Sequence, residues 1–102
     1  MKILDNIRIG SIDYSINYVI NLYSDEGQRL LGEIDFDNST ILLDNTVQGA
    51  QALQVTFLHE LVHGMLYSVN SEFTHNETLI DDIAKSLHQV IRDNPGLFLI
   101  SE

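Results

Sequence analysis

The sequence predicts an α+β domain in which the strands come first and two helices follow. The first half of the chain alternates apolar and polar residues with a period of about two, as strands do. The second half repeats apolar residues at spacings of three and four, as amphipathic helices do. A small antiparallel or mixed sheet packed on two helices would bury both sets of side chains. We expect residues 1–102 to form one domain.

Four short segments of the first half are typical of strands. Residues 7–9 and 12–20 carry apolar side chains at alternate positions. Residues 32–36 and 40–43 do the same on either side of a polar turn at residues 37–39. The last two segments form the clearest hairpin that the sequence predicts.

A first helix is expected from about Val47 to Val69, with Asn45 or Thr46 as its N-cap. Apolar residues recur along it at helical spacing, so one side of the helix should be buried. Gly64 lies inside this helix. It marks either a close approach of another element or a tolerated glycine that costs about 1 kcal/mol.

The motif His59-Glu60-Leu61-Val62-His63 lies within this helix and reads H-E-x-x-H. Residues four apart on a helix share a face, so both imidazoles can hold one divalent metal. Glu60 is displaced to the side, from where its carboxylate can act as a base on water. The alternative is a pair of surface histidines beside a solvated glutamate.

A catalytic zinc usually takes three protein ligands, and we expect Glu77 to be the third. Six residues after His63 the chain has Val69, which excludes the metzincin pattern. Glu77 has an alternative role, because Thr74 and Glu77 have the spacing of a capping box that would occupy the carboxylate on the backbone. His75 is the alternative ligand.

A second amphipathic helix is expected from about Asn76 to Arg92. Asp81 lies on nearly the same face as Glu77, where it could accept a hydrogen bond from His59 and orient that ring. His88 is too far along the helix to share a metal with Glu77, and we expect it at the surface or at a boundary. Residues 97–100 form a short apolar tail, expected to be packed on the core or in a small strand.

The motif H-E-x-x-H followed by N-E-x-x-x-D resembles the gluzincin pattern of the thermolysin type. In that resemblance His59, His63 and Glu77 match the zinc ligands and Glu60 matches the general base. Asp81 matches the aspartate that supports a ligand.

The chain as a whole is similar to small phage and mobile-element metallopeptidases of the ImmA/IrrE-like group. The similar segments are LLGEIDFDNSTILLD (residues 30–44), TFLHELVHGML (residues 56–66) and NETLIDDIAKSLHQVIRDNPGLF (residues 76–98). The similarity covers most of residues 30–98. This chain is small, and we expect it to lack the additional domain that longer relatives carry.

The resemblance implies a minimal zincin that holds one zinc per chain and hydrolyses a peptide bond in a narrow protein substrate, such as a regulator. In such folds an extended substrate pairs with an edge strand, which residues 41–44 or 32–37 would provide here. Tyr67 is the nearest tyrosine in sequence that could assist the oxyanion, although a helix tyrosine partly buried in packing is the favoured interpretation. Two rival functions remain. One is a non-catalytic, zinc-stabilised interaction or regulatory protein, and the other is a metal-free interaction domain in which Glu77 is a cap.

Composition limits the partners. The net charge is −10 and the five basic residues are scattered, so we expect no nucleic-acid partner. The chain has no cysteine, which excludes disulfides and thiolate metal sites. No stretch is typical of a signal peptide or a membrane span, so we expect a cytoplasmic protein without a membrane partner, either monomeric or weakly dimeric.

Overall fold

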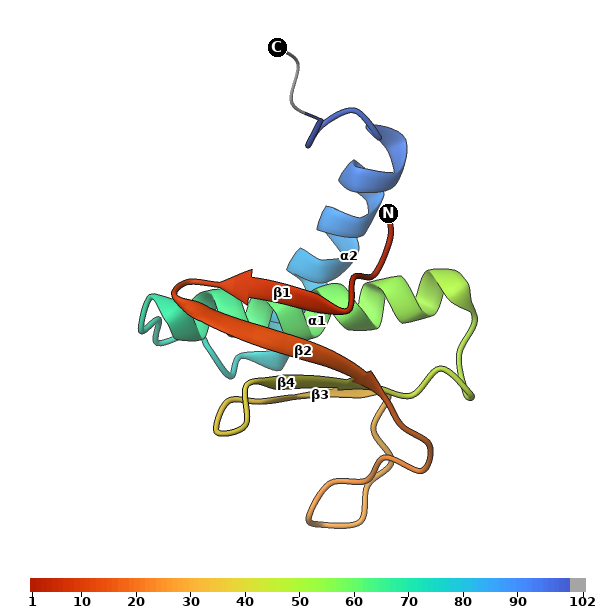
Figure 1. Cartoon of the computed structure of the whole chain (residues 1–102), viewed down its shortest axis with the longest axis vertical. Helices are drawn as coiled ribbons and strands as arrows, with labels where there is room; N and C mark the ends of the chain where they lie inside the picture. The colour runs from red at the N-terminus through yellow and green to blue at the C-terminus, as the bar shows by residue number, and fades with distance from the viewer. Residues whose placement is uncertain (100–102) are drawn as a thin grey trace.

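A computed structural model describes residues 1–99 and has the α+β architecture that the sequence predicts (Figure 1). In chain order, the elements are β1 (Asn6–Ile9), β2 (Ile12–Tyr18), β3 (Gly32–Asp35), β4 (Thr40–Leu43), α1 (Ala50–Ser68) and α2 (Glu77–Asp93). The predicted hairpin is present as β3 and β4. The four strands form one mixed sheet, and this confirms the predicted fold class.

The strands lie in the order β1-β2-β4-β3. The β1–β2 and β3–β4 pairs are antiparallel, whereas β2 and β4 run parallel. Residues 19–31 carry the chain from the end of β2 to the far edge, where β3 begins, and β4 then fills the position between β2 and β3. Because β4 has a neighbour on both sides, the prediction that residues 41–44 form an edge of the sheet is wrong. The other predicted edge segment, residues 32–37, contains β3, which does lie at an edge.

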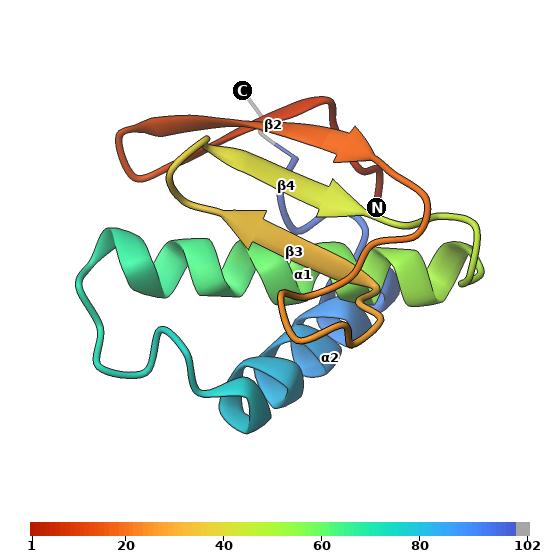
Figure 2. The same ribbon diagram turned by 90° about the horizontal axis from the view of Figure 1, so that it is seen from below.

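The molecule has three layers, with α1 between the sheet and α2 (Figure 2). Helix α1 contacts β1, β3 and β4 on one side and α2 on the other, and in the described residues no Cα atom of α2 lies within 8 Å of a strand. Inward-facing residues of the strands and of both helices form the core: Ile9, Tyr14, Ile16, Ile41, Leu43, Phe57, Leu58 and Ala84. The polar residues between them on the strands face away from α1, as expected for a sheet with one covered face.

Gly64 lies where α1 approaches the sheet most closely. A Cβ at this position would lie 2.8 Å from Cδ1 of Ile9 and 3.1 Å from Cδ1 of Ile34. Both contacts are shorter than ordinary van der Waals distances. The close approach of another element at Gly64, which was one of its two sequence interpretations, is therefore confirmed.

Replacing Gly64 by valine should destabilise the protein by about 1–3 kcal/mol, because the added methyl groups overpack the helix–sheet contact. Urea denaturation of the two proteins measures the change. Gly96→Val is the matched control, since a Cβ at Gly96 meets no heavy atom within 4 Å. An unchanged midpoint for Gly64→Val would mean that the sheet can move away from the helix at no cost.

Helix α1 begins at Ala50, three residues later than predicted, and its N-cap is Gly49. The predicted N-caps Asn45 and Thr46 are wrong for a physical reason. The side chain of Asp44 accepts hydrogen bonds from the backbone N–H and the hydroxyl of Thr46, which holds this segment in a turn.

The C-terminal tail also differs from its prediction. Leu97, Phe98 and Leu99 are 55%, 71% and 78% exposed and belong to no strand, so they neither pack on the core nor extend the sheet. Residue 100 of the predicted tail lies outside the described residues. Neither helix in residues 1–99 has the length and hydropathy needed to span a bilayer.

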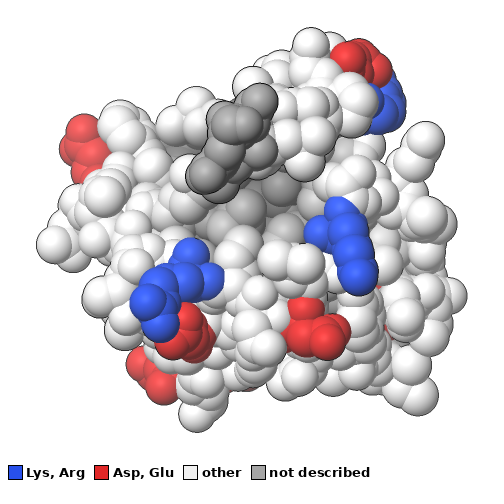
Figure 3. Space-filling view, turned by 45° about the horizontal axis from the view of Figure 1, so that its top comes forward, with Lys and Arg blue, Asp and Glu red and all other residues white. Residues whose placement is uncertain are grey.

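Positive charge is dispersed on the face drawn in Figure 3. Basic side chains stand apart from one another there, and acidic side chains lie beside some of them. Arg8 donates two hydrogen bonds to Asp13, at 2.8 and 2.9 Å. Both side chains are well exposed, so the pair neutralises local charge and contributes little to stability.

Candidate metal centre

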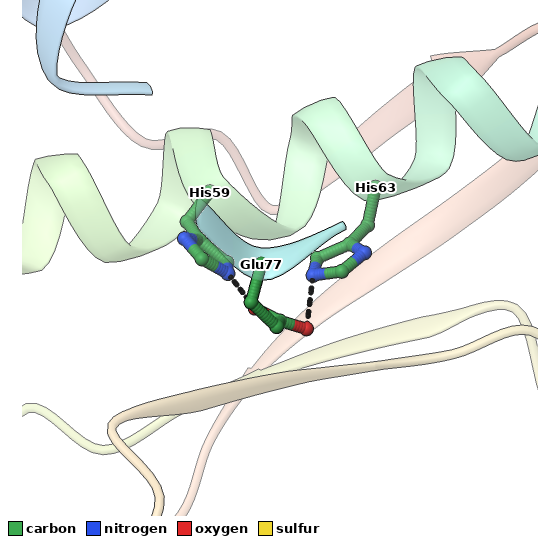
Figure 4. A group of neighbouring side chains, drawn as sticks. All are labelled: His59, His63 and Glu77. Carbon is green, nitrogen blue, oxygen red and sulfur yellow. Dashed lines mark hydrogen bonds and ion pairs between the residues drawn. The ribbon is translucent and has the colours of Figure 1, made fainter. Parts of the chain in front are cut away.

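Three side chains converge where the start of α2 meets the middle of α1 (Figure 4). Nε2 of His59 lies 2.8 Å from Oε2 of Glu77, and Nε2 of His63 lies 3.0 Å from Oε1 of the same carboxylate. The two imidazole centroids are 5.0 Å apart, as i and i+4 residues of one helix should be. The structure therefore brings together the three residues that the sequence suggests as metal ligands.

The ring of His63 is held in one orientation by the backbone. Its Nδ1 lies 2.6 Å from the carbonyl oxygen of Thr74, and both residues are buried. Because a carbonyl only accepts, Nδ1 carries the proton and donates it, which leaves a lone pair on Nε2. This is the arrangement in which ligating histidines are usually found.

Asp81 lies beside His59, as expected, but its carboxylate is shared with a second partner. Its Oδ1 is 3.6 Å from Nδ1 of His59, which is too long for a hydrogen bond. Its Oδ2 accepts a hydrogen bond from Lys85 at 2.7 Å, and this bond lowers the pKa of Asp81. Asp81 is thus positioned to orient His59 only after a small shift of either side chain.

Glu77 is free to face the histidines because another residue caps α2. The N-cap is Asn76, whose side-chain oxygen accepts a hydrogen bond from the backbone N–H of Leu79 at 3.0 Å. The hydroxyl of Thr74 donates to the carbonyl of Ser71 instead. The capping-box alternative for Thr74 and Glu77 is therefore wrong, and Glu77 occupies the first position of the helix.

The three ligand groups suit a zinc ion. Their donor atoms all lie within 4.8 Å of one another, and two ligands of one tetrahedral zinc are about 3.3 Å apart. The distances from the two Nε2 atoms to the Glu77 oxygens are 2.8 and 3.0 Å, so they need to grow by only a few tenths of an ångström to reach this separation. Glu77 can supply that movement, since its side chain is 68% exposed. Nitrogen and oxygen donors without a thiolate are also typical of catalytic zinc sites.

The acidic residue of the motif, Glu60, is buried, at 7% exposure. Its pKa is raised from 4.5 to about 7, chiefly by burial, and the negative charges of Glu77 and Glu33 contribute to the rise. The charge of His59 and a hydrogen bond from the Ile34 backbone oppose this rise. A carboxylate with a pKa near neutrality can both accept and return a proton under physiological conditions.

A cleft of about 1070 Å³ runs past these residues. One wall is the polar face of α1 with His59, Glu60 and His63, and the opposite wall is the edge strand β3. Residues 24 and 26 and residues 28–31 from the loop between β2 and β3 line it as well. The candidate metal ligands thus open onto a groove whose other side is an unpaired strand edge.

The remaining sequence candidates lie in different places. His75 lines the cleft, with its ring centroid 6.3 Å from that of His63, but it is not among the three converging residues. Tyr67 stacks on Phe36 with ring centroids 4.0 Å apart and does not line the cleft. The packing interpretation therefore fits Tyr67 better than the role of an oxyanion donor.

The prediction that His88 lies at the surface or a boundary is wrong. His88 is only 6% exposed, and its Nε2 lies 2.8 Å from the side-chain oxygen of Gln54 on α1. This contact joins the two helices through a satisfied polar pair. Buried histidines of this kind need a partner, and the partner here is 34 residues away in sequence.

Two contributors to the site have no sequence signal, because both are backbone groups. One is the carbonyl of Thr74, which orients His63, and the other is the N–H of Ile34, which lies against Glu60. A backbone group is present at every position, so only the folded chain reveals which of them are used.

No family model matches the chain, and neither a curated protein nor a solved structure matches it. The resemblance to ImmA/IrrE-like metallopeptidases therefore rests on the residues quoted for it.

Proposed function

We propose that this protein is a zinc-dependent peptidase in which His59, His63 and Glu77 hold one zinc ion. The observation that carries the proposal is the convergence of both Nε2 atoms on the Glu77 carboxylate beside the buried Glu60, at the wall of a large cleft. A protein regulator, as in the family that the chain resembles, is a fitting substrate.

The chain's own groups have distinct tasks in this reaction. A bound zinc ion would supply a Lewis acid that polarises a peptide carbonyl and makes water acidic. Glu60 takes a proton from the attacking water at its carboxylate and returns it to the leaving amine. Burial of Glu60 favours this exchange, because it raises the pKa of the carboxyl to about 7.

The substrate is expected to lie in the cleft as an extended strand paired with β3. This strand is the edge of the sheet and faces α1 across the cleft. Strand addition satisfies the free N–H and C=O groups of an edge, and it positions a peptide without requiring a particular side chain.

The test begins with zinc content and ends with turnover. The purified protein, with no affinity tag and after dialysis, should contain about one zinc per chain by elemental mass spectrometry. Incubation with a peptide library, read by mass spectrometry, should yield cleavage products with the wild type and none with Glu60→Gln, which keeps its zinc. Cleavage by Glu60→Gln at the wild-type rate would eliminate Glu60 as the base, and a zinc-free wild type would overturn the proposal.

One observation favours a second function, a non-catalytic protein stabilised by zinc. Among the helices and strands of residues 1–99, α2 lies against α1 alone, so a metal held by residues of both helices would join two layers of the fold. This alternative also requires bound zinc, but it requires no change in function when Glu60 becomes glutamine. The Glu60→Gln comparison therefore separates the two proposals.

A further inference from the structure

The free edge of β3 is defined by its hydrogen bonds to β4. The backbone N–H of Asp44 donates to the carbonyl of Leu31 at 3.0 Å, and bonded pairs alternate along an antiparallel ladder. Glu33 is therefore hydrogen-bonded to β4, while Gly32 and Ile34 turn their N–H and C=O groups outward. The N–H of Ile34 donates to Glu60, which leaves the two backbone groups of Gly32 and the C=O of Ile34 for an added strand. A strand added to this edge would bond to Gly32 and Ile34.

This register determines which side chain of an added strand meets Glu33. In an antiparallel pairing, the residue opposite Glu33 would form a pair without hydrogen bonds, in which the two Cα atoms lie about 4.5 Å apart. Its side chain would leave the same face of the sheet as that of Glu33. Its two neighbours would point to the opposite face, towards α1, because a Cβ at Gly32 would meet the side chain of Thr56.

The charges around the cleft favour a cation opposite Glu33. Both basic side chains that line the cleft already have acidic partners, Arg29 with Asp44 at 3.3 Å and Lys85 with Asp81 at 2.7 Å. Glu33 lines the cleft too, and within residues 1–99 its carboxylate has neither an ion pair nor a hydrogen bond. A basic side chain of a bound peptide would thus find an unneutralised carboxylate.

The α1 side of the cleft favours apolar neighbours. Ala52 and Val55 of α1 line the cleft on the side that these two neighbours would face. Exposed apolar side chains within a groove are typical of a surface that a partner covers. The two residues that flank the cation would rest on this surface.

We infer that Glu33 selects a lysine or arginine in the bound peptide, at the centre of an apolar–basic–apolar sequence. This inference rests on the proposed function and specifies its substrate class. Opposite charges in directly facing strand positions favour pairing by up to about fivefold in affinity. The preference should weaken as salt is added, because the pair is close to solvent.

The test is peptide binding to the zinc-loaded Glu60→Gln protein, in which cleavage is prevented. Three labelled synthetic octapeptides carry lysine, glutamine or glutamate between two leucines, and fluorescence anisotropy at low salt gives their affinities. The lysine peptide is expected to bind about fivefold more tightly than the glutamine peptide, and the glutamate peptide more weakly. Adding Glu33→Lys should reverse this order, and Glu33→Gln should make the lysine and glutamine peptides equal.

Asp5→Lys in the same protein is the control, since it changes the net charge equally from an exposed position next to β1, at the other edge of the sheet. The inference would be overturned if Glu33→Lys left the order of the three peptide affinities unchanged. It would also be overturned if Asp5→Lys reversed that order as well. The zinc content of the same samples separates it from the proposed function. Zinc binding without a preference set by Glu33 overturns the inference alone. A preference set by Glu33 in a protein that binds no zinc keeps the inference and overturns the zinc peptidase.

Discussion

Removal of zinc is expected to lower the Tm of the wild-type protein by roughly 20 °C. A ligand that binds only the folded state at a thousand times its Kd adds about 4 kcal/mol to the free energy of unfolding. In a domain of this size each kcal/mol corresponds to roughly 4–8 °C. The effect should be large here because the ligands His59, His63 and Glu77 lie on two helices, and α1 is the only helix or strand within residues 1–99 that comes within 8 Å of α2, Cα to Cα.

Glu77→Ala should lose most of this zinc-dependent rise, because it removes the ligand that α2 contributes. Scanning calorimetry with excess zinc and with excess chelator measures the rise in each protein. Glu72→Ala is the matched control, since Glu72 is an exposed acid of the loop before α2 and does not line the cleft. Equal melting temperatures of the wild type in zinc and in chelator would contradict the metal site.

The local parts of the site could be predicted from the sequence, because helix geometry relates residues that are close in the chain. The spacing of His59 and His63 places both rings on one face, and their centroids are indeed 5.0 Å apart. The choice between ligand and cap for Glu77 depended on which residue starts α2. Asn76 is as good an N-cap as Thr74, and only the folded chain distinguishes them.

The non-local parts could not be predicted, since a period of two indicates strands but not their neighbours. The parallel pairing of β2 with β4, which leaves β3 at the edge, depends on the path of residues 19–31 across the sheet. The burial of His88 likewise depends on Gln54, which belongs to the other helix. In both cases the deciding contact joins residues that no local pattern relates.

Glu60→Gln is expected to stabilise the metal-free protein by about 3 kcal/mol at pH 8, although it removes the proposed catalytic base. The pKa of Glu60 rises from 4.5 to about 7 in the folded chain, chiefly through burial. The folded chain therefore binds this proton more tightly than the unfolded chain does. As a result, the free energy of unfolding falls as the pH rises from 4.5 to about 7. This loss of stability in the wild-type protein is absent below pH 4.5, grows up to about pH 7 and stays constant above it. Glutamine carries no charge, and its side-chain oxygen can still accept from the Ile34 backbone.

Urea denaturation of both proteins in chelator at several pH values tests this expectation, with the exposed Glu72→Gln as a control that should match the wild type. The informative quantity is the difference between Glu60→Gln and wild type, because the other titrating groups are common to both and largely cancel. A difference that does not change between pH 5 and pH 8 would show that Glu60 titrates alike in the folded and unfolded chains. A difference that widens with pH would mean that the fold keeps a destabilising carboxylate beside the metal ligands. A purely structural role of zinc does not explain a buried carboxylate that destabilises the fold, whereas a catalytic role does. The pH dependence of stability therefore bears directly on whether the site is catalytic.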